Sequence, residues 1–204
     1  GKMKLKLTLV VVSSMMLGGC LSTPAVEVSN ICNLMDEEVS WYRSIKASEK
    51  KYGAPAHVQL AIMYQESHFA SDAKPPREKL FGVVPWFRSS SAYGFAQAKD
   101  GTWDWYQLKT GNYSADRDNF DDAADFVGWY INQSNKRSGI SKSDAYNQYL
   151  AYHEGHGGFN KKSYLAKDWL MKIAKGVEKN AKRYKKQLNQ CASQLDSNRI
   201  WKFF

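Results

Sequence analysis

The sequence lacks the patterns of a β-rich or repetitive protein. No run of alternating hydrophobic and polar residues reaches strand length, and no segment repeats along the chain. Hydrophobic residues make up 43% and charged residues 24% of the 204 residues, values that exclude wholesale disorder and a multi-span membrane protein. We therefore expect a mostly helical domain with long loops.

Signals of several common chemistries are also absent. The chain has no Gly-rich phosphate-binding loop, and no Ser or Cys nucleophile has an evident partner. His153 and His156 are not four residues apart as in the zinc-peptidase helix, and Gly155 would break a helix that aligned such ligands. The sequence therefore predicts neither a metal nor another cofactor.

Aromatic residues, by contrast, are abundant. They make up 14% of the chain, which suggests a groove for flat-faced ligands such as sugar rings or bases. The formal net charge of +9 indicates an anionic partner without identifying it.

The first residues have the layout of a secretory signal. Three lysines precede a short apolar run that is too short for a stop-transfer helix, and Leu17-Gly18-Gly19-Cys20 resembles a bacterial lipobox. This resemblance implies a signal peptide over 1–19, a lipidated Cys20 and a tether over 20–30. Leu21 resembles outer-membrane sorting, so we expect a periplasmic protein anchored by lipid to the outer membrane of a Gram-negative bacterium. An ordinary cleaved signal or a buried apolar strand is the alternative.

The other two cysteines bracket nearly all of the remaining chain. In an oxidising periplasm Cys32 and Cys191 most simply form one disulfide between the first and last helices, although two free thiols are the alternative. We expect a domain over 31–191 and a C-terminal tail over 192–204.

Helical periodicity indicates how this domain is built. Hydrophobic residues recur at three- and four-residue steps after Ile31, and Gly53 and Pro55 separate that helix from the next. Residues 70–92 form an irregular loop that contains an unusually long segment, Lys74–Ser90, for which we weigh a cover over the cleft against packing beside the domain. Further helices are expected over 120–133, 143–152 and 162–190, the last with a stripe from Leu165 and Trp169 to Leu188.

Glu66 stands in the last turn of the helix expected over 55–68. Its apolar neighbours and the negative end of the helix dipole both favour the protonated carboxyl group. A carboxylic acid kept neutral near pH 7 can donate a proton to a leaving oxygen, as glycoside cleavage requires. In isolation, however, a Glu near a helix end is usually a solvated surface residue.

Three ordered segments change that interpretation. Gln65-Glu66-Ser67, Tyr93-Gly94-Phe95-Ala96-Gln97 and Ala151-Tyr152-His153-Glu154-Gly155 resemble the Glu-Ser, Gly-x-x-Gln and Ala-Tyr-Asn-x-Gly motifs of lytic transglycosylases with an SLT-type domain. The resemblance covers about residues 40–185. It implies a mainly α, lysozyme-like fold, related to goose-type lysozyme, with long loops around a glycan-binding cleft.

The same resemblance implies roles for individual residues. Glu66 would be the single catalytic acid and base, and the expected substrate-binding residues are Ser67, Tyr93, Gly94, Phe95, Gln97, Tyr152 and His153. Gly94 would let the backbone approach the glycan. His153 stands where the family usually has Asn. Four aromatic residues are candidates for stacking on sugars, or simply for the core: Tyr93, Phe95, Trp103 and Trp105.

The implied reaction is cleavage of the MurNAc-GlcNAc bond in peptidoglycan with formation of a 1,6-anhydro sugar. The alternatives are a goose-type hydrolase, which needs a second carboxylate, and a non-catalytic wall-binding lipoprotein. Candidates for that carboxylate are Asp72, Asp121, Asp122 and Glu154. The expected partners are peptidoglycan strands and, through Cys20, a membrane; export argues against nucleic acid, and we expect a monomer. The basic run Lys172–Lys186 is interpreted as a solvated face, with an anionic-ligand patch as the alternative.

Overall fold

A computed structural model describes residues 28–80, 84–85 and 87–201. The expected signal peptide, Cys20 and most of the tether lie outside the described residues, as do Phe81 and Trp86. The described chain is mainly α-helical, which confirms the fold class expected from the sequence.

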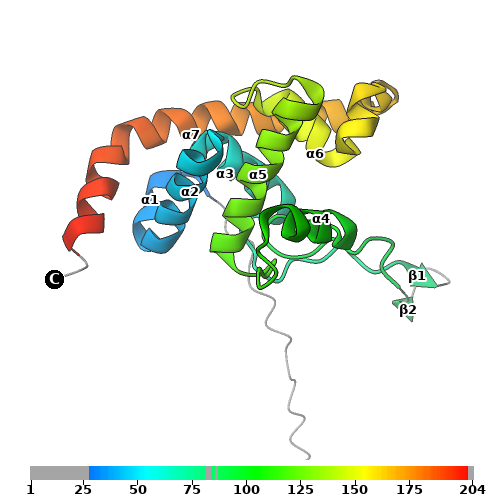
Figure 1. Ribbon diagram of the computed structural model, residues 1–204, viewed down its shortest axis with the longest axis horizontal. Helices are drawn as coiled ribbons and strands as arrows, with labels where there is room; N and C mark the ends of the chain where they lie inside the picture. Colours follow the sequence, from blue (N-terminus) through cyan, green and yellow to red (C-terminus); the bar gives the residue numbers. More distant parts are fainter. Residues whose placement is uncertain (1–27, 81–83, 86, 202–204) are drawn as a thin grey trace, which may run out of the picture.

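Helix α3 (Ala56–Ser67) lies at the centre of the molecule (Figure 1). Gly53, with a left-handed φ of 66°, ends α2 (Val39–Tyr52), and Pro55 precedes α3, as predicted. Val58 and the run Leu60–Met63 are fully buried, so α3 is apolar on nearly every side rather than along one stripe. Helices from both halves of the chain pack around it: α2, α5 (Phe120–Ser138), α6 (Ala145–Asn160) and α7 (Asp168–Trp201).

The first helix and α4 differ from the sequence prediction. The helix expected to begin at Ile31 is broken at Glu38 into α1 (Ile31–Glu37) and α2. Helix α4 (Asp100–Thr110) was not predicted, because only Trp103 and Tyr106 along it are buried. Three turns of mostly polar residues therefore carry too little hydrophobic periodicity to be recognised.

Helix α7 begins later and ends later than expected. A short 3-10 turn, η1 (Ser163–Ala166), precedes it, and the helix continues through Trp201 into the segment expected to be a separate tail. Leu165 and Trp169 are 59% and 53% exposed, so they do not belong to its buried face. That face includes Leu170, Ala174, Val177, Ala181, Tyr184 and Leu195.

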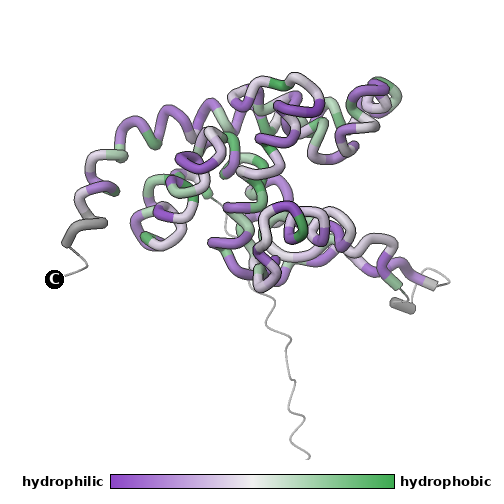
Figure 2. The backbone as a smooth tube through the Cα atoms, in the orientation of Figure 1, coloured by the Kyte–Doolittle hydropathy of each residue, from purple (hydrophilic) through white to green (hydrophobic). Residues whose placement is uncertain are grey.

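The outer face of α7 is solvated. The basic residues between Lys172 and Lys186 are exposed, and Figure 2 shows hydrophobic and hydrophilic residues alternating along the helix. Among the described residues, no helix is both long and apolar enough to cross a bilayer.

A disulfide joins α1 to α7, as the sequence predicted. Cys32 and Cys191 are bonded across 159 residues of sequence, with their Cα atoms 6.1 Å apart. Closing a loop of that length stabilises the fold by up to about 5 kcal/mol in the chain-entropy model. The crosslink therefore holds both ends of the domain on the same side of α3.

The long loop between α3 and α4 contains a small hairpin. Strands β1 (Lys79–Leu80) and β2 (Val84–Pro85) pair antiparallel, and the hairpin projects away from the helices (Figure 1). Phe87, just beyond it, is 54% exposed. Among the described residues of the segment Lys74–Ser90, only Pro75 lines the pocket that contains Glu66.

Candidate active site

Glu66 opens into a pocket of about 430 Å³. Its walls come from the end of α3, the segment around residues 92–99, the start of α4, the middle of α5 and the bend in α6. Glu66, Gln97, Tyr152 and His153, all expected site residues, line it together. The other lining residues are Pro75, Ala92, Ala98, Lys99, Thr102, Phe126, Tyr130, Glu154 and Gly155.

The surroundings of the Glu66 carboxyl group favour its protonated form. Its side chain is mostly enclosed, and burial raises its pKa to about 7, while a hydrogen bond with Tyr149 acts in the opposite direction. Tyr149 stands three residues before Tyr152 on α6, so both phenols lie on one face of that helix. The pocket thus contains an acid that can still donate a proton near neutral pH.

This pKa predicts how stability depends on pH. The carboxyl group ionises near pH 4.5 when unfolded but near pH 7 when folded, so the folded protein loses stability as pH rises between these values. We expect Glu66→Gln to be about 3 kcal/mol more stable than wild type at pH 8. Below pH 4.5 the two proteins should unfold alike. Urea titrations at pH 4 and pH 8 measure this difference; an equal difference at both values would contradict the raised pKa.

The turn Tyr93–Ala98 is held by side chains from all three motifs. Ser67 Oγ donates to the Phe95 carbonyl over 2.7 Å, and Tyr152 Oη donates to the Ala96 carbonyl over 2.6 Å. Gln97 Nε2 donates to the Gly94 carbonyl over 2.8 Å and to the Ala73 carbonyl over 2.8 Å. These bonds fix the turn beside Glu66 and leave the Gln97 amide oxygen as the group that can contact a ligand.

Four residues expected to bind substrate do not line the pocket. Ser67 is buried and bonds to backbone, and Phe95 packs in the core against Trp41. Tyr93 directs its hydroxyl to Asp118. Gly94, expected to admit the glycan, instead admits protein backbone, because a Cβ there would lie 2.0 Å from the Arg117 carbonyl oxygen. These residues shape the turn rather than touch the pocket.

The aromatic lining also differs from the expectation. Trp103 is 6% exposed and, with Trp105, is absent from the pocket wall, which contains Phe126 and Tyr130 instead. Both stand on the buried face of α5, and their packing against Tyr152 places one side of each ring at the pocket. A sugar ring in the pocket would therefore meet these two residues.

A second carboxylate, Glu154, lines the pocket beside His153. Lys167 Nζ lies 2.7 Å from Glu154 Oε1, Ser163 Oγ donates to Oε2, and His153 Nδ1 lies 3.1 Å from Oε1. Burial acts to raise the pKa of Glu154, but these three partners together lower it to about 2. Glu154 therefore stays ionised near neutral pH, and its charge is balanced by Lys167.

Two residues of the site were not predicted from the sequence. Lys167 belongs to no recognisable motif, whereas Tyr149 could have been found from its three-residue spacing from Tyr152.

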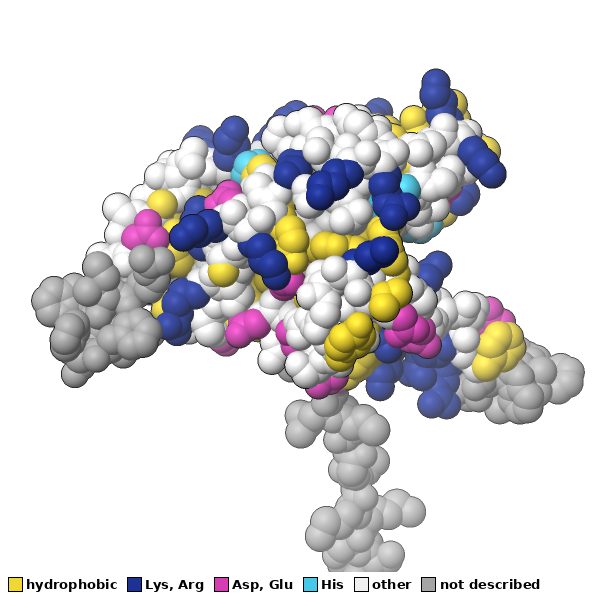
Figure 3. All heavy atoms as spheres, in the orientation of Figure 1, with side chains coloured by type: hydrophobic (Ala, Val, Ile, Leu, Met, Phe, Trp, Pro, Cys, Tyr) yellow, Lys and Arg dark blue, Asp and Glu magenta, His cyan; other side chains and the backbone are white. Residues whose placement is uncertain are grey.

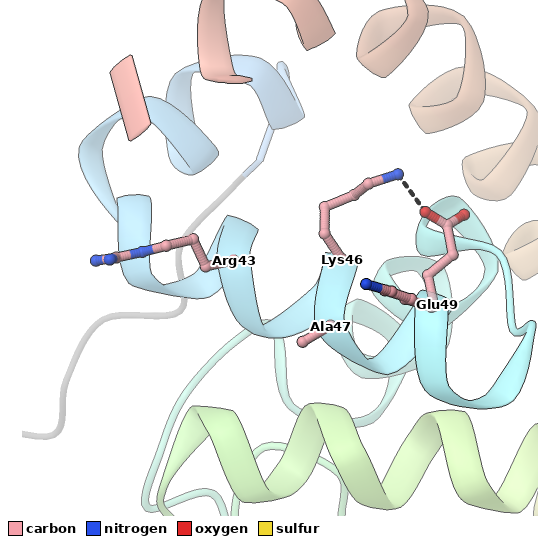
Figure 4. Close-up of a pocket in the computed structure, with 5 residues that line it drawn as sticks. Arg43, Lys46, Ala47 and Glu49 are labelled. Carbon is pink, nitrogen blue, oxygen red and sulfur yellow. Dashed lines mark hydrogen bonds and ion pairs between the residues drawn. The ribbon is translucent and has the colours of Figure 1, made fainter. Parts of the chain in front are cut away.

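Other possible centres are weaker. Within the described ranges, no three His, Cys, Asp or Glu side chains gather in a way that could hold a metal ion. A hollow on the outer face of α2 is lined by Arg43, Lys46, Ala47, Glu49 and Lys50 (Figure 4). Its carboxylate, Glu49, is bonded to Lys46 and to the Ala56 amide, so this hollow offers no free acid.

Comparison with known proteins identifies one family. The family model described as Transglycosylase SLT domain matches residues 8–191, most of the chain. No curated protein and no solved structure matches the chain.

Proposed function

Because the chain belongs to the transglycosylase SLT domain family, whose fold is lysozyme-like, we propose that it is a peptidoglycan lytic transglycosylase with Glu66 as its single acid and base. Membership supports a lytic transglycosylase-type function in general. The finer proposal is cleavage of the β-1,4 bond between MurNAc and GlcNAc with release of 1,6-anhydroMurNAc. The observation that carries it is an enclosed carboxyl group with a pKa of about 7 in a pocket wide enough for a sugar.

The reaction needs one proton donor that later accepts a proton. Glu66 protonates the bridging oxygen as its bond to C1 of MurNAc breaks, and the acetamido group of that sugar assists from its own side. The Glu66 carboxylate then removes the proton of the C6 hydroxyl while O6 bonds to C1. The carboxyl group is restored and no water is consumed, so a second carboxylate is unnecessary.

The state of Glu154 favours this reaction over hydrolysis. Of the four candidates for a second carboxylate, only Glu154 lines the pocket of the described structure. Its oxygens are engaged by Lys167, Ser163 and His153, and a pKa of about 2 makes it a poor base toward water. Asp121 and Asp122 are engaged elsewhere, with Ser44 and with Asn112 and the Asp116 amide.

The products distinguish the two reactions. We expect mass spectrometry of sacculi digested by the protein to detect muropeptides that end in 1,6-anhydroMurNAc. Reducing MurNAc ends, two hydrogens and one oxygen heavier, would instead support a goose-type hydrolase.

We also propose that the protein is exported and attached by lipid at Cys20 to the outer membrane of a Gram-negative cell. The motif Leu17-Gly18-Gly19-Cys20 supports this assignment. Labelled palmitate should be incorporated by the wild type and not by Cys20→Ser; equal incorporation would overturn it.

A further inference from the structure

A second hollow of about 400 Å³ lies between α4 and α5 and shares no lining residue with the Glu66 pocket. Tyr52 of α2 forms part of its wall. Its lining residues are Lys51, Tyr52, Trp105, Lys109, Thr110, Trp129, Asn132, Gln133, Lys136 and Arg137. The motif residues of the sequence contribute nothing to it.

The lining carries positive charge only. It holds four cationic side chains and no carboxylate. Lys51 is neutralised by Asp125 at 2.7 Å, but within the described part of the chain no carboxylate pairs with Lys109, Lys136 or Arg137. Figure 3 shows Lys and Arg side chains gathered over the upper part of this face. Such an arrangement favours an anionic ligand.

The aromatic residues give the hollow a fixed shape. The Arg137 guanidinium lies 4.6 Å from the centre of the Trp105 ring, and Trp105 packs edge-to-face on Trp129 at 4.5 Å. Stacking and a hydrogen bond from Arg137 Nε to Gln133 hold the planar guanidinium in one place, while its terminal N–H groups remain available for a carboxylate. Trp105 also packs against Tyr130, which lines the Glu66 pocket. The rings of Trp105 and Tyr130 therefore lie between this hollow and the Glu66 pocket.

We propose that this hollow binds the free carboxylate groups of the peptide stems that are attached to the glycan strand. The inference rests on the proposed function, because peptidoglycan then supplies the ligand. The amino sugars carry no anionic group apart from these peptides, whereas the hollow presents three unpaired cations beside exposed ring edges. Trp105, which lines this hollow, packs against Tyr130, which lines the Glu66 pocket, so the proposed peptide site adjoins the proposed glycan site.

Binding can be measured without cleavage in a Glu66→Gln background. We expect Lys109→Glu/Lys136→Glu to weaken binding of soluble, peptide-bearing glycan strands about tenfold by calorimetry at moderate salt. Binding of N-acetylglucosamine oligomers, which carry no carboxylate, should change less than twofold. The preference for peptide-bearing strands should also decline as salt is raised.

Lys175→Glu/Lys179→Glu on the exposed face of α7 is the matched control, with the same change in net charge. Equal losses on both kinds of ligand, an equal loss in the control, or no loss would each overturn the inference. Lys109→Gln/Lys136→Gln repeats the test should the charge-reversed protein fail to fold. Failure of the proposed function is separate, since wild-type digests would then lack anhydro ends whatever the strand preference.

Discussion

Glu66→Gln should reduce the release of anhydromuropeptides from sacculi by about 10³-fold. The amide has the size of the carboxyl group and can still accept the hydrogen bond from Tyr149, so the pocket keeps its shape. It has no proton to give to the bridging oxygen and no carboxylate to take one from the C6 hydroxyl. Because one residue performs both steps, both are lost together.

The measurement is the initial rate of release of soluble fragments, with products identified by mass spectrometry. Glu178→Gln is the control, because it removes a partly exposed carboxylate on α7 that forms an ion pair with Lys182 and does not line the Glu66 pocket. It should retain the wild-type rate. A Glu66→Gln protein that clears sacculi as fast as the parent would identify a non-catalytic role for Glu66.

The activity should also follow the ionisation of Glu66. The acid is protonated below its pKa of about 7, so the rate of the first proton transfer declines above that pH as the carboxyl group ionises. Glu154, with a pKa of about 2, keeps its charge across this range, so it adds no further pH dependence to the rate near neutrality.

The sequence predicted the core helices where local signals agreed. Gly53 and Pro55 predicted the boundary between α2 and α3, and the helix expected from residue 120 begins there as α5. Prediction failed where burial depends on distant elements. Trp169 has the right spacing for the α7 stripe, but it lies against His153 at the pocket edge and is exposed.

The members of the candidate site were predicted in part, and their contacts were not predicted. Motif resemblance brought Glu66, Gln97 and Tyr152 together correctly. It could not indicate that Ser67 and Tyr152 both donate hydrogen bonds to carbonyls of one turn, because these partners are set by how α3, the turn and α6 pack together in space.

Gly94→Ala should destabilise the fold by about 4 kcal/mol. Gly94 has a φ of 77°, which strains any L side chain, and a Cβ there would also overlap the Arg117 backbone. A carbonyl group cannot swing aside as a flexible side chain can. The Gly94 carbonyl also accepts from Gln97, so movement of the turn shifts a pocket residue.

Gly111→Ala separates the cost of strain at a positive φ from the cost of overlap with the Arg117 backbone. Gly111 has a similar φ of 74°, but a Cβ there meets nothing within 4 Å, so this variant should lose only about 1 kcal/mol. Urea unfolding of both variants measures the difference, which is the cost of displacing Arg117. If the two lose equal stability, the backbone around Arg117 yields freely and the turn is not fixed there. If Gly94→Ala also lowers the catalytic rate per folded molecule and Gly111→Ala does not, the position of the turn Tyr93–Ala98 affects catalysis, and strain at a positive φ alone does not.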